Sequence, residues 1–162
     1  MKISSNPKEN LKKLKNRKVC IVVSNFYPKI SNMLIKGALK KLKKYNMSKF
    51  ILYSVPGTFE IPSAISMLIY NKKNIFVFDG FIVLGCVIKG ETSHFDYICS
   101  SVINAITNIS VKYRIPIGNG ILTCNKKKQA MQRADPKKGD RGGNAANAVI
   151  SFFNLFQDNY EE

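Results

Sequence analysis

The chain has 162 residues, of which 45% are hydrophobic and 22% are charged, a composition typical of one globular domain rather than of a disordered, collagen-like or coiled-coil protein. Lysine and arginine number 26 against 10 aspartates and glutamates, which gives a formal net charge of +16. The apolar stretches fall short of the roughly 18 residues of a membrane-spanning helix, and the basic start lacks the apolar run of a secretory signal. We therefore expect a cytoplasmic protein that does not enter a membrane.

Strand-like and helix-like segments alternate along the chain after a polar, basic tail at residues 1–17. Short apolar runs bounded by turn residues predict buried strands, and apolar residues that recur every three or four positions predict amphipathic helices. In chain order, the predicted elements are strand 18–24, helix 29–45, strand 50–55, helix 61–70, strand 81–88, helix 92–113, strand 115–123, and helices 126–134 and 144–156. Because no linker or repeat divides residues 18–162, we expect one domain after the tail.

This alternation predicts an α/β fold in which helices cover both faces of a parallel sheet. Ligands of such folds gather at the carboxyl ends of the strands. Four loops follow those ends, and the residue types that are rare elsewhere in the chain cluster in them. The loops are 25–28, 56–60, 89–94 and 124–126. We therefore expect the functional site at this edge of the sheet.

The loop at residues 89–94 carries the clearest chemical signal. Gly90 permits a sharp turn, and Thr92 or Ser93 can cap the helix that follows, so its free N–H groups predict an anion site. His94 is the only histidine and lies in the first helical turn, where the helix dipole disfavours its protonation and keeps it available as a base. A histidine without a role is the alternative, but its place beside an anion cup favours proton transfer. No second histidine or cysteine pair indicates a metal site.

Two further loops carry candidate binding residues. Glu60 is either an exposed helix cap or a hydrogen-bond acceptor for a polyol, and the sequence leaves these alternatives equal. Phe26 and Tyr27 follow the first strand, where a ring can stack on a flat ligand, with ordinary core packing as the alternative.

Arg133, with Lys137 and Arg141 nearby, either holds a phosphate or belongs to a solvated basic face. The net charge suggests a polyanionic partner. However, only four of the 26 cations are arginines, the residue that reads bases and phosphates with a bidentate fork. From composition alone, a solvated lysine-rich surface is therefore the preferred interpretation over specific nucleic-acid binding.

The four cysteines form no CxxC pair, and each lies in an apolar or strand-like context. This spacing argues against zinc and against a disulfide framework. We expect free, buried thiols in a reducing compartment. The cysteines are Cys20, Cys86, Cys99 and Cys124.

Five segments together resemble the lumazine synthase family, in its order and spacing over residues 18–157. They are SNFYPKISNMLIKGAL (24–39), VPGTFEIPSAI (55–65), DGFIVLGCVIKGETSHFDYI (79–98), GNGILTCNKKKQAMQRA (118–134) and GDRGGNAANAV (139–149). The resemblance implies a flavodoxin-like, three-layer α/β/α sandwich with a four-stranded parallel sheet. It also implies a cofactor-free condensation of 5-amino-6-(D-ribitylamino)uracil with 3,4-dihydroxy-2-butanone 4-phosphate. The product would be 6,7-dimethyl-8-ribityllumazine, with release of phosphate and water, in the penultimate step of riboflavin biosynthesis.

Matching the family's motifs position by position assigns a role to each site residue. His94 matches the proton-transfer histidine, and Phe26 matches the aromatic ring that stacks on the pyrimidine. The remaining matches are Thr58, Phe59 and Glu60 for the ribityl chain, Cys86, Val87 and Ile88 for the pyrimidinedione, Asn119 for the position of a stacking ring, and Glu91, Thr92, Arg133 and Arg141 for the phosphate.

Three residues depart from the family pattern. Asn119 stands where many members have Phe, which weakens stacking; Arg141 replaces a usual Lys; and Asn25 replaces a common Arg. None of these changes removes the residues that would carry the chemistry. Two other classes of function remain as alternatives: a carrier that only stores a lumazine or flavin, and a basic structural or nucleic-acid-associated protein.

The resemblance also implies an assembly. Family members form pentamers with active sites between adjacent subunits, and Arg133 would come from the neighbouring subunit. Some members assemble further into sixty-subunit shells, and riboflavin synthase is the protein partner that the resemblance implies.

Overall fold

Four parallel strands form one sheet in a computed structural model that describes residues 14–70, 73 and 75–156. The strand order is β2-β1-β3-β4, so the chain first builds outward to one edge and then crosses back to the other. The strands are β1 (Val19–Ser24), β2 (Phe50–Val55), β3 (Gly80–Ile88) and β4 (Ile117–Cys124). This order and the parallel pairing confirm the predicted flavodoxin-like α/β fold.

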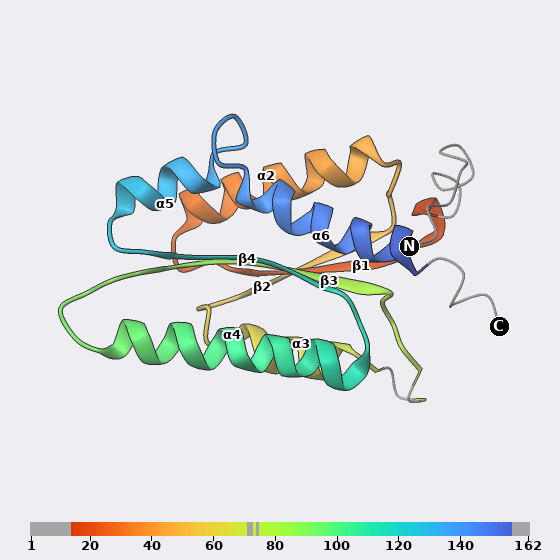
Figure 1. Ribbon diagram of the computed structural model, residues 1–162, viewed down its shortest axis with the longest axis horizontal. Coiled ribbons are helices and arrows are strands. Elements are labelled where there is room, and N and C mark those ends of the chain that lie inside the picture. Colours follow the sequence, from red (N-terminus) through yellow and green to blue (C-terminus); the bar gives the residue numbers. More distant parts are fainter. Residues whose placement is uncertain (1–13, 71–72, 74, 157–162) are drawn as a thin grey trace.

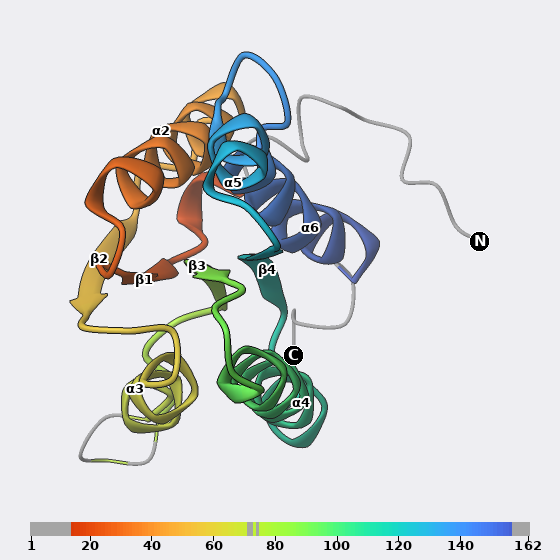
Figure 2. The same cartoon turned by 90° about the vertical axis from the view of Figure 1, so that its left-hand side faces the viewer.

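The helices form two layers, one on each face of the sheet (Figures 1 and 2). One layer contains α2 (Pro28–Lys44), α5 (Lys127–Ala134) and α6 (Arg141–Leu155). The other contains α3 (Ile61–Leu68) and α4 (His94–Tyr113). The predicted three-layer sandwich is therefore present.

Both faces of the central strands are buried, which explains why β1 and β3 read as nearly continuous apolar runs. Every residue of β1 is buried. Ile21 points into the core beneath α2 and α6, whereas Cys20 and Val22 point into the core beneath α3 and α4. The alternation of side chains along each strand thus divides the interior into two apolar clusters.

Helices α2 and α6 pack closely because glycine lies at their contact. A Cβ added to Gly142, in the first turn of α6, would lie 2.7 Å from the carbonyl carbon of Leu34 and 2.9 Å from its Cα. The start of α6 is further fixed by Asp140, whose side chain accepts a hydrogen bond from the Gly143 N–H at 3.1 Å. This contact determines where the first residue of α6, Arg141, is held.

Most predicted element bounds agree with the structure to within two residues, but α6 begins three residues earlier than predicted. The Asp140 cap explains the difference, because it starts the helix ahead of Gly142 and Gly143, which the sequence assigns to a turn.

The last residues of the predicted tail also pack on the domain. Leu14 is only 2% exposed, and Arg17 forms an ion pair with Asp79 at 3.1 Å. Residues 1–13 of the predicted tail lie outside the described residues.

Strand β2 forms one edge of the sheet and is unusually apolar for an exposed element. Its residues Phe50 to Tyr53 are each 38–40% exposed. An uncovered apolar edge strand is a template for pairing with another chain.

None of the described helices is long and apolar enough to cross a bilayer.

Candidate functional site

A cavity of about 270 Å³ lies at the carboxyl ends of the strands, between the first turn of α4 and the loops that follow β1 and β2. The parallel sheet brings these loops to one edge although they are far apart in sequence. The cavity gathers eight of the predicted site residues: Phe26, Thr58, Phe59, Glu60, Cys86, Val87, Ile88 and His94.

Two aromatic side chains at this cavity are largely exposed to solvent. Phe26 is 67% exposed and Phe59 is 60% exposed, so the alternative that Phe26 packs in the core is wrong. The Phe26 and Tyr27 rings form a T-shaped pair, with ring centroids 4.9 Å apart and an interplanar angle of 75°. Exposed rings at a cavity mouth are suited to stacking on a flat ligand.

Glu60 closes the loop that follows β2. Its Oε2 accepts a hydrogen bond from the Gly57 N–H at 2.9 Å, and although it occupies the N-cap position of α3, its side chain makes no capping bond to that helix. The simple helix-cap alternative is therefore not realised. A carboxylate has about four acceptor positions, so Glu60 retains acceptor capacity toward the cavity while one oxygen is held by the loop.

His94 is the first residue of α4, and its imidazole lines the cavity. Its backbone N–H donates to Thr92 Oγ1 at 3.4 Å. Ser93 occupies the N-cap position without a side-chain capping bond, so Thr92, rather than Ser93, provides the local hydroxyl contact. Glu91 and Thr92 lie in the exposed loop before the helix and are absent from the cavity lining.

The cavity contains a cysteine, but its environment makes it a poor nucleophile. Burial, reinforced by the neighbouring Cys124 and Cys99, raises the pKa of the Cys86 thiol to about 12. The thiolate is the reactive form, so Cys86 contributes to the cavity lining as a small, neutral, apolar side chain. All four cysteines are free. Cys20, Cys86 and Cys124 are buried as predicted, whereas Cys99 on α4 is only partly buried.

A second, separate cavity of about 170 Å³ lies along β4, the edge strand on the opposite side of the sheet from β2. It gathers three more predicted residues, Asn119, Arg133 and Arg141. Asn119 Oδ1 accepts from the Ile121 N–H at 2.9 Å. Burial raises the pKa of Cys124 at the end of β4, whereas the positive charge of Arg133 acts in the opposite direction. The two cavities share no lining residue, so the chain presents the predicted site residues in two separate places.

Tyr27, the other aromatic candidate after the first strand, also lines the first cavity and packs against the core. Sequence reasoning missed two lining residues, Gly57 and Ile98. Ile98 lies one helical turn after His94, so the helical period alone would place it on the same face. Gly57 has its role through the hydrogen bond to Glu60, a contact with no signal in the sequence.

A larger cleft, about 540 Å³, lies at the opposite end of the sheet and is lined by residues such as Phe78, Tyr113 and Phe153. It contains none of the predicted site residues, and its acidic member, Asp79, is already paired with Arg17. The two smaller cavities, which contain the predicted site residues, are therefore better candidates for the functional site than this larger cleft. Within the described residues, no group of three His, Cys, Asp or Glu side chains is placed to hold a metal ion.

Comparison with known proteins agrees with this geometry. A family model described as 6,7-dimethyl-8-ribityllumazine synthase matches residues 16–157. Three curated relatives carry the same name. They come from Limosilactobacillus reuteri (38% identical, covering 88% of the chain and 91% of the relative), Bartonella tribocorum (41%, 87% and 93%) and Ruthia magnifica (37%, 97% and 96%).

Proposed function

The chain belongs to the 6,7-dimethyl-8-ribityllumazine synthase family, transferases of riboflavin biosynthesis, and we propose that it condenses 5-amino-6-(D-ribitylamino)uracil with 3,4-dihydroxy-2-butanone 4-phosphate. The product is 6,7-dimethyl-8-ribityllumazine, and phosphate and water are released. The observation that carries this proposal is the gathering of eight predicted residues around one cavity at the carboxyl ends of the strands, among them Phe26, Glu60 and His94, which the sequence indicated without reference to the family.

The pyrimidine substrate occupies this first cavity. Its ring stacks on the exposed aromatic ring of Phe26, and the backbone at the end of β3, from Cys86 to Ile88, reads its two carbonyl groups. The ribityl chain lies along Thr58 and Phe59, and Glu60 accepts hydrogen bonds from its hydroxyls. The loop hydrogen bond to Gly57 supports this role, because it orients the carboxylate before the substrate arrives.

His94 transfers protons between the reacting groups. Its imidazole lines the same cavity as Phe26 and Glu60, and proton transfer by one positioned side chain contributes roughly 10²- to 10⁴-fold to a rate. The rest of the acceleration comes from holding two reactants in a reactive geometry.

The phosphate of the second substrate binds between two subunits. The loop of Glu91 and Thr92 at the start of α4 provides N–H groups from one subunit, and Arg133 provides a guanidinium from the next, with Arg141 beside it. Asn119 from that same neighbour contacts the pyrimidine side. The separation of the two cavities in one subunit supports this arrangement, because neither cavity alone holds all of these groups.

We propose a cyclic pentamer that acts in the cytoplasm. The apolar edge of β2 supports a head-to-tail interface, since an assembly would cover it. The four free cysteines support a reducing compartment. Assembly of pentamers into a sixty-subunit shell, and association with riboflavin synthase, are further proposals that rest on the family alone.

Turnover of both substrates by the purified protein, followed optically as lumazine appears, tests the reaction. Sustained formation of product is the expected result. A folded assembly that binds the lumazine but forms none would contradict the proposal and favour a carrier.

A mixing experiment tests the shared site. His94→Ala and Arg133→Ala subunits are assayed separately and after coassembly, at low concentrations of the phosphorylated substrate. Random coassembly around a head-to-tail ring restores both wild-type groups at about one quarter of the interfaces, so we expect up to about that share of wild-type activity. Activity no higher than the mean of the two variants would mean that each site lies within one chain.

A further inference from the structure

The positive charge of the described chain is concentrated on one of its two helical layers. Residues 28–49 and 125–156, which include α2, α5 and α6, contain 14 lysines and arginines against two aspartates, a net charge of +12. The opposite layer, residues 56–70 and 89–114, contains three cations and three carboxylates, a net charge of zero. A compositional bias toward lysine would distribute charge over both layers, so the one-sided arrangement requires another explanation.

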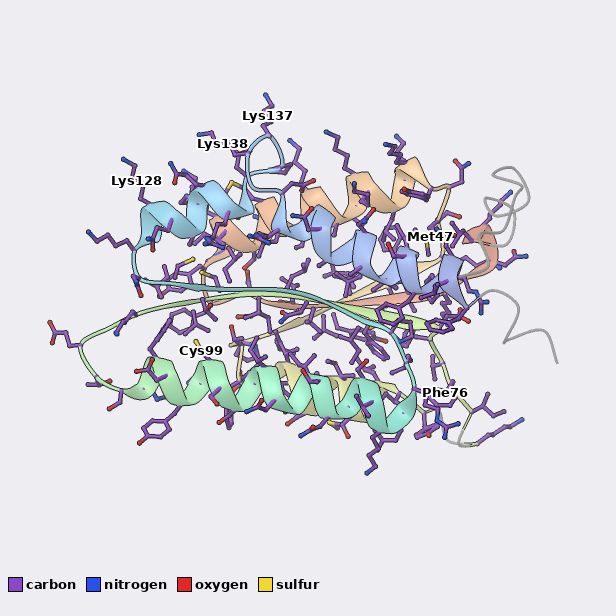
Figure 3. The ribbon with its side chains drawn as sticks, in the orientation of Figure 1. Met47, Phe76, Cys99, Lys128, Lys137 and Lys138 are labelled. Atoms are coloured by element: carbon purple, nitrogen blue, oxygen red, sulfur yellow. The ribbon has the colours of Figure 1, made fainter. Side chains whose placement is uncertain are left out.

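Twelve of these cations form what we call the lysine surface, which excludes Arg133 and Arg141 of the proposed site. Eleven of the twelve are exposed, and Lys41 is half-buried. In Figure 3, the side chains of Lys128, Lys137 and Lys138 point away from the sheet, toward solvent. The lysine surface consists of Lys29, Lys36, Lys40, Lys41, Lys43, Lys44, Lys49, Lys126, Lys127, Lys128, Lys137 and Lys138.

The two acidic residues of this layer do not neutralise the lysines. Asp135 Oδ1 accepts from the Lys137 backbone N–H at 2.9 Å, and Asp140 caps α6. In the part of the chain that the structure describes, no lysine of this surface forms an ion pair. Lys36, Lys40 and Lys44 follow one another at four-residue spacing along α2, and like charges at that spacing destabilise a helix. The layer therefore keeps an unbalanced positive charge at some loss of helix stability.

The other side chains on the lysine surface limit the class of polyanion that it can bind. None of the largely exposed large apolar side chains belongs to α2, α5 or the turn that follows α5, so the surface lacks the apolar anchors of a membrane-binding helix. For the same reason it lacks the exposed aromatic platforms on which single-stranded bases stack. Lysine acts as a point charge on phosphates rather than as a bidentate reader of bases.

We propose that the lysine surface binds the phosphate backbone of double-stranded nucleic acid without reading its sequence. The surface consists mainly of exposed positions on and beside α2 and α5, in the helical layer opposite α3 and α4 (Figure 1). None of these lysines lines the cavity of Phe26 and His94. This inference is independent of the proposed enzymatic reaction.

Fluorescence anisotropy with labelled duplexes tests the proposal. We use two unrelated sequences of about 30 base pairs and vary potassium chloride from roughly 50 to 200 mM. The test variant K36Q/K40Q removes two charges from the lysine surface. The control K73Q/K112Q removes two charges outside it, so both variants carry the same net charge. Circular dichroism and thermal unfolding of each variant verify that it is folded.

We expect the wild-type protein to bind both duplexes equally, with affinity that falls steeply with salt. K36Q/K40Q should bind several-fold more weakly than K73Q/K112Q, and its log–log salt slope should decrease by about 1 to 2, since each phosphate contact contributes about 0.9. Failure to bind duplex at the lowest salt, or equal weakening by both variants, would overturn the proposal. Tighter binding to a single strand of the same length, or to vesicles of anionic lipid, would also overturn it.

Discussion

Replacement of Gly142 by Ala should destabilise the protein, although alanine is the better helix former. The added Cβ would lie 2.7 Å and 2.9 Å from two backbone atoms of Leu34, whereas carbon atoms prefer separations of about 3.5–4.0 Å. Helices α2 and α6 would therefore have to move apart by roughly 1 Å. Overpacking of this kind costs typically 1–3 kcal/mol or more, and the clash here is with backbone, which cannot rotate away. Taking the upper value of about 3 kcal/mol for this backbone clash and subtracting the gain of about 1 kcal/mol in helix propensity, we expect a net loss of about 2 kcal/mol.

Thermal unfolding at a fixed protein concentration measures this effect. For a chain of this size, 2 kcal/mol corresponds to a decrease in Tm of about 4–8 °C. Gly90→Ala is the matched control, because a Cβ at Gly90 meets nothing within 4 Å and its φ is negative. We expect its Tm to stay within about 2 °C of wild type. A Gly142→Ala protein as stable as wild type would show that the close approach of α6 to α2 does not constrain the fold.

His94→Ala should lower turnover by about 10- to 1000-fold with a smaller effect on substrate binding, and unchanged turnover would mean that another group transfers the proton. Arg133→Ala should chiefly raise the KM for the phosphorylated substrate, as measured by steady-state kinetics at saturating pyrimidine; a change confined to the pyrimidine's KM would contradict the phosphate assignment. Burial raises the pKa of Cys20 and of Cys86 from 9.0 to about 12, so near pH 8 their thiolate fraction should be about 1000-fold below that of an exposed thiol. Alkylation followed by mass spectrometry should therefore label these two cysteines only after unfolding; rapid labelling in the native state would refute their burial.

The fold could be predicted from the sequence because its signals are local and agree with one another. The apolar run of β3 and the amphipathic period of α2 each define an element, and their alternation with the other elements implies a parallel sheet. The start of α6 was the least predictable boundary. Its N-terminal glycines resemble a turn, and only the side-chain bond of Asp140 to the Gly143 N–H shows that the helix begins before them.

Local signals in the sequence predicted which loops would meet, whereas only the family resemblance implied that the candidate residues would be divided between two places. Residue types that are rare elsewhere pointed to the loops of Phe26, Glu60 and His94, and those loops do meet at one cavity. Nothing local in the sequence shows that Asn119 and Arg133 line a different cavity, because that separation follows from the position of β4 at the sheet edge. The apolar character of β2 was evident, whereas its exposure depends on strand order and could not be read from its own residues.

The uncovered edge of β2 has a consequence for the newly made chain. Residues Phe50 to Tyr53 leave the ribosome before β3 and β4 are synthesised, and in the folded chain they still offer unpaired backbone groups and apolar side chains. Two chains that meet in the wrong register can pair at this edge and start an aggregate. The net charge of +16 opposes such encounters, because like-charged chains repel one another at a distance. The excess of lysine therefore favours solubility during synthesis through the charge of the whole chain, and not through charges within β2, which has none.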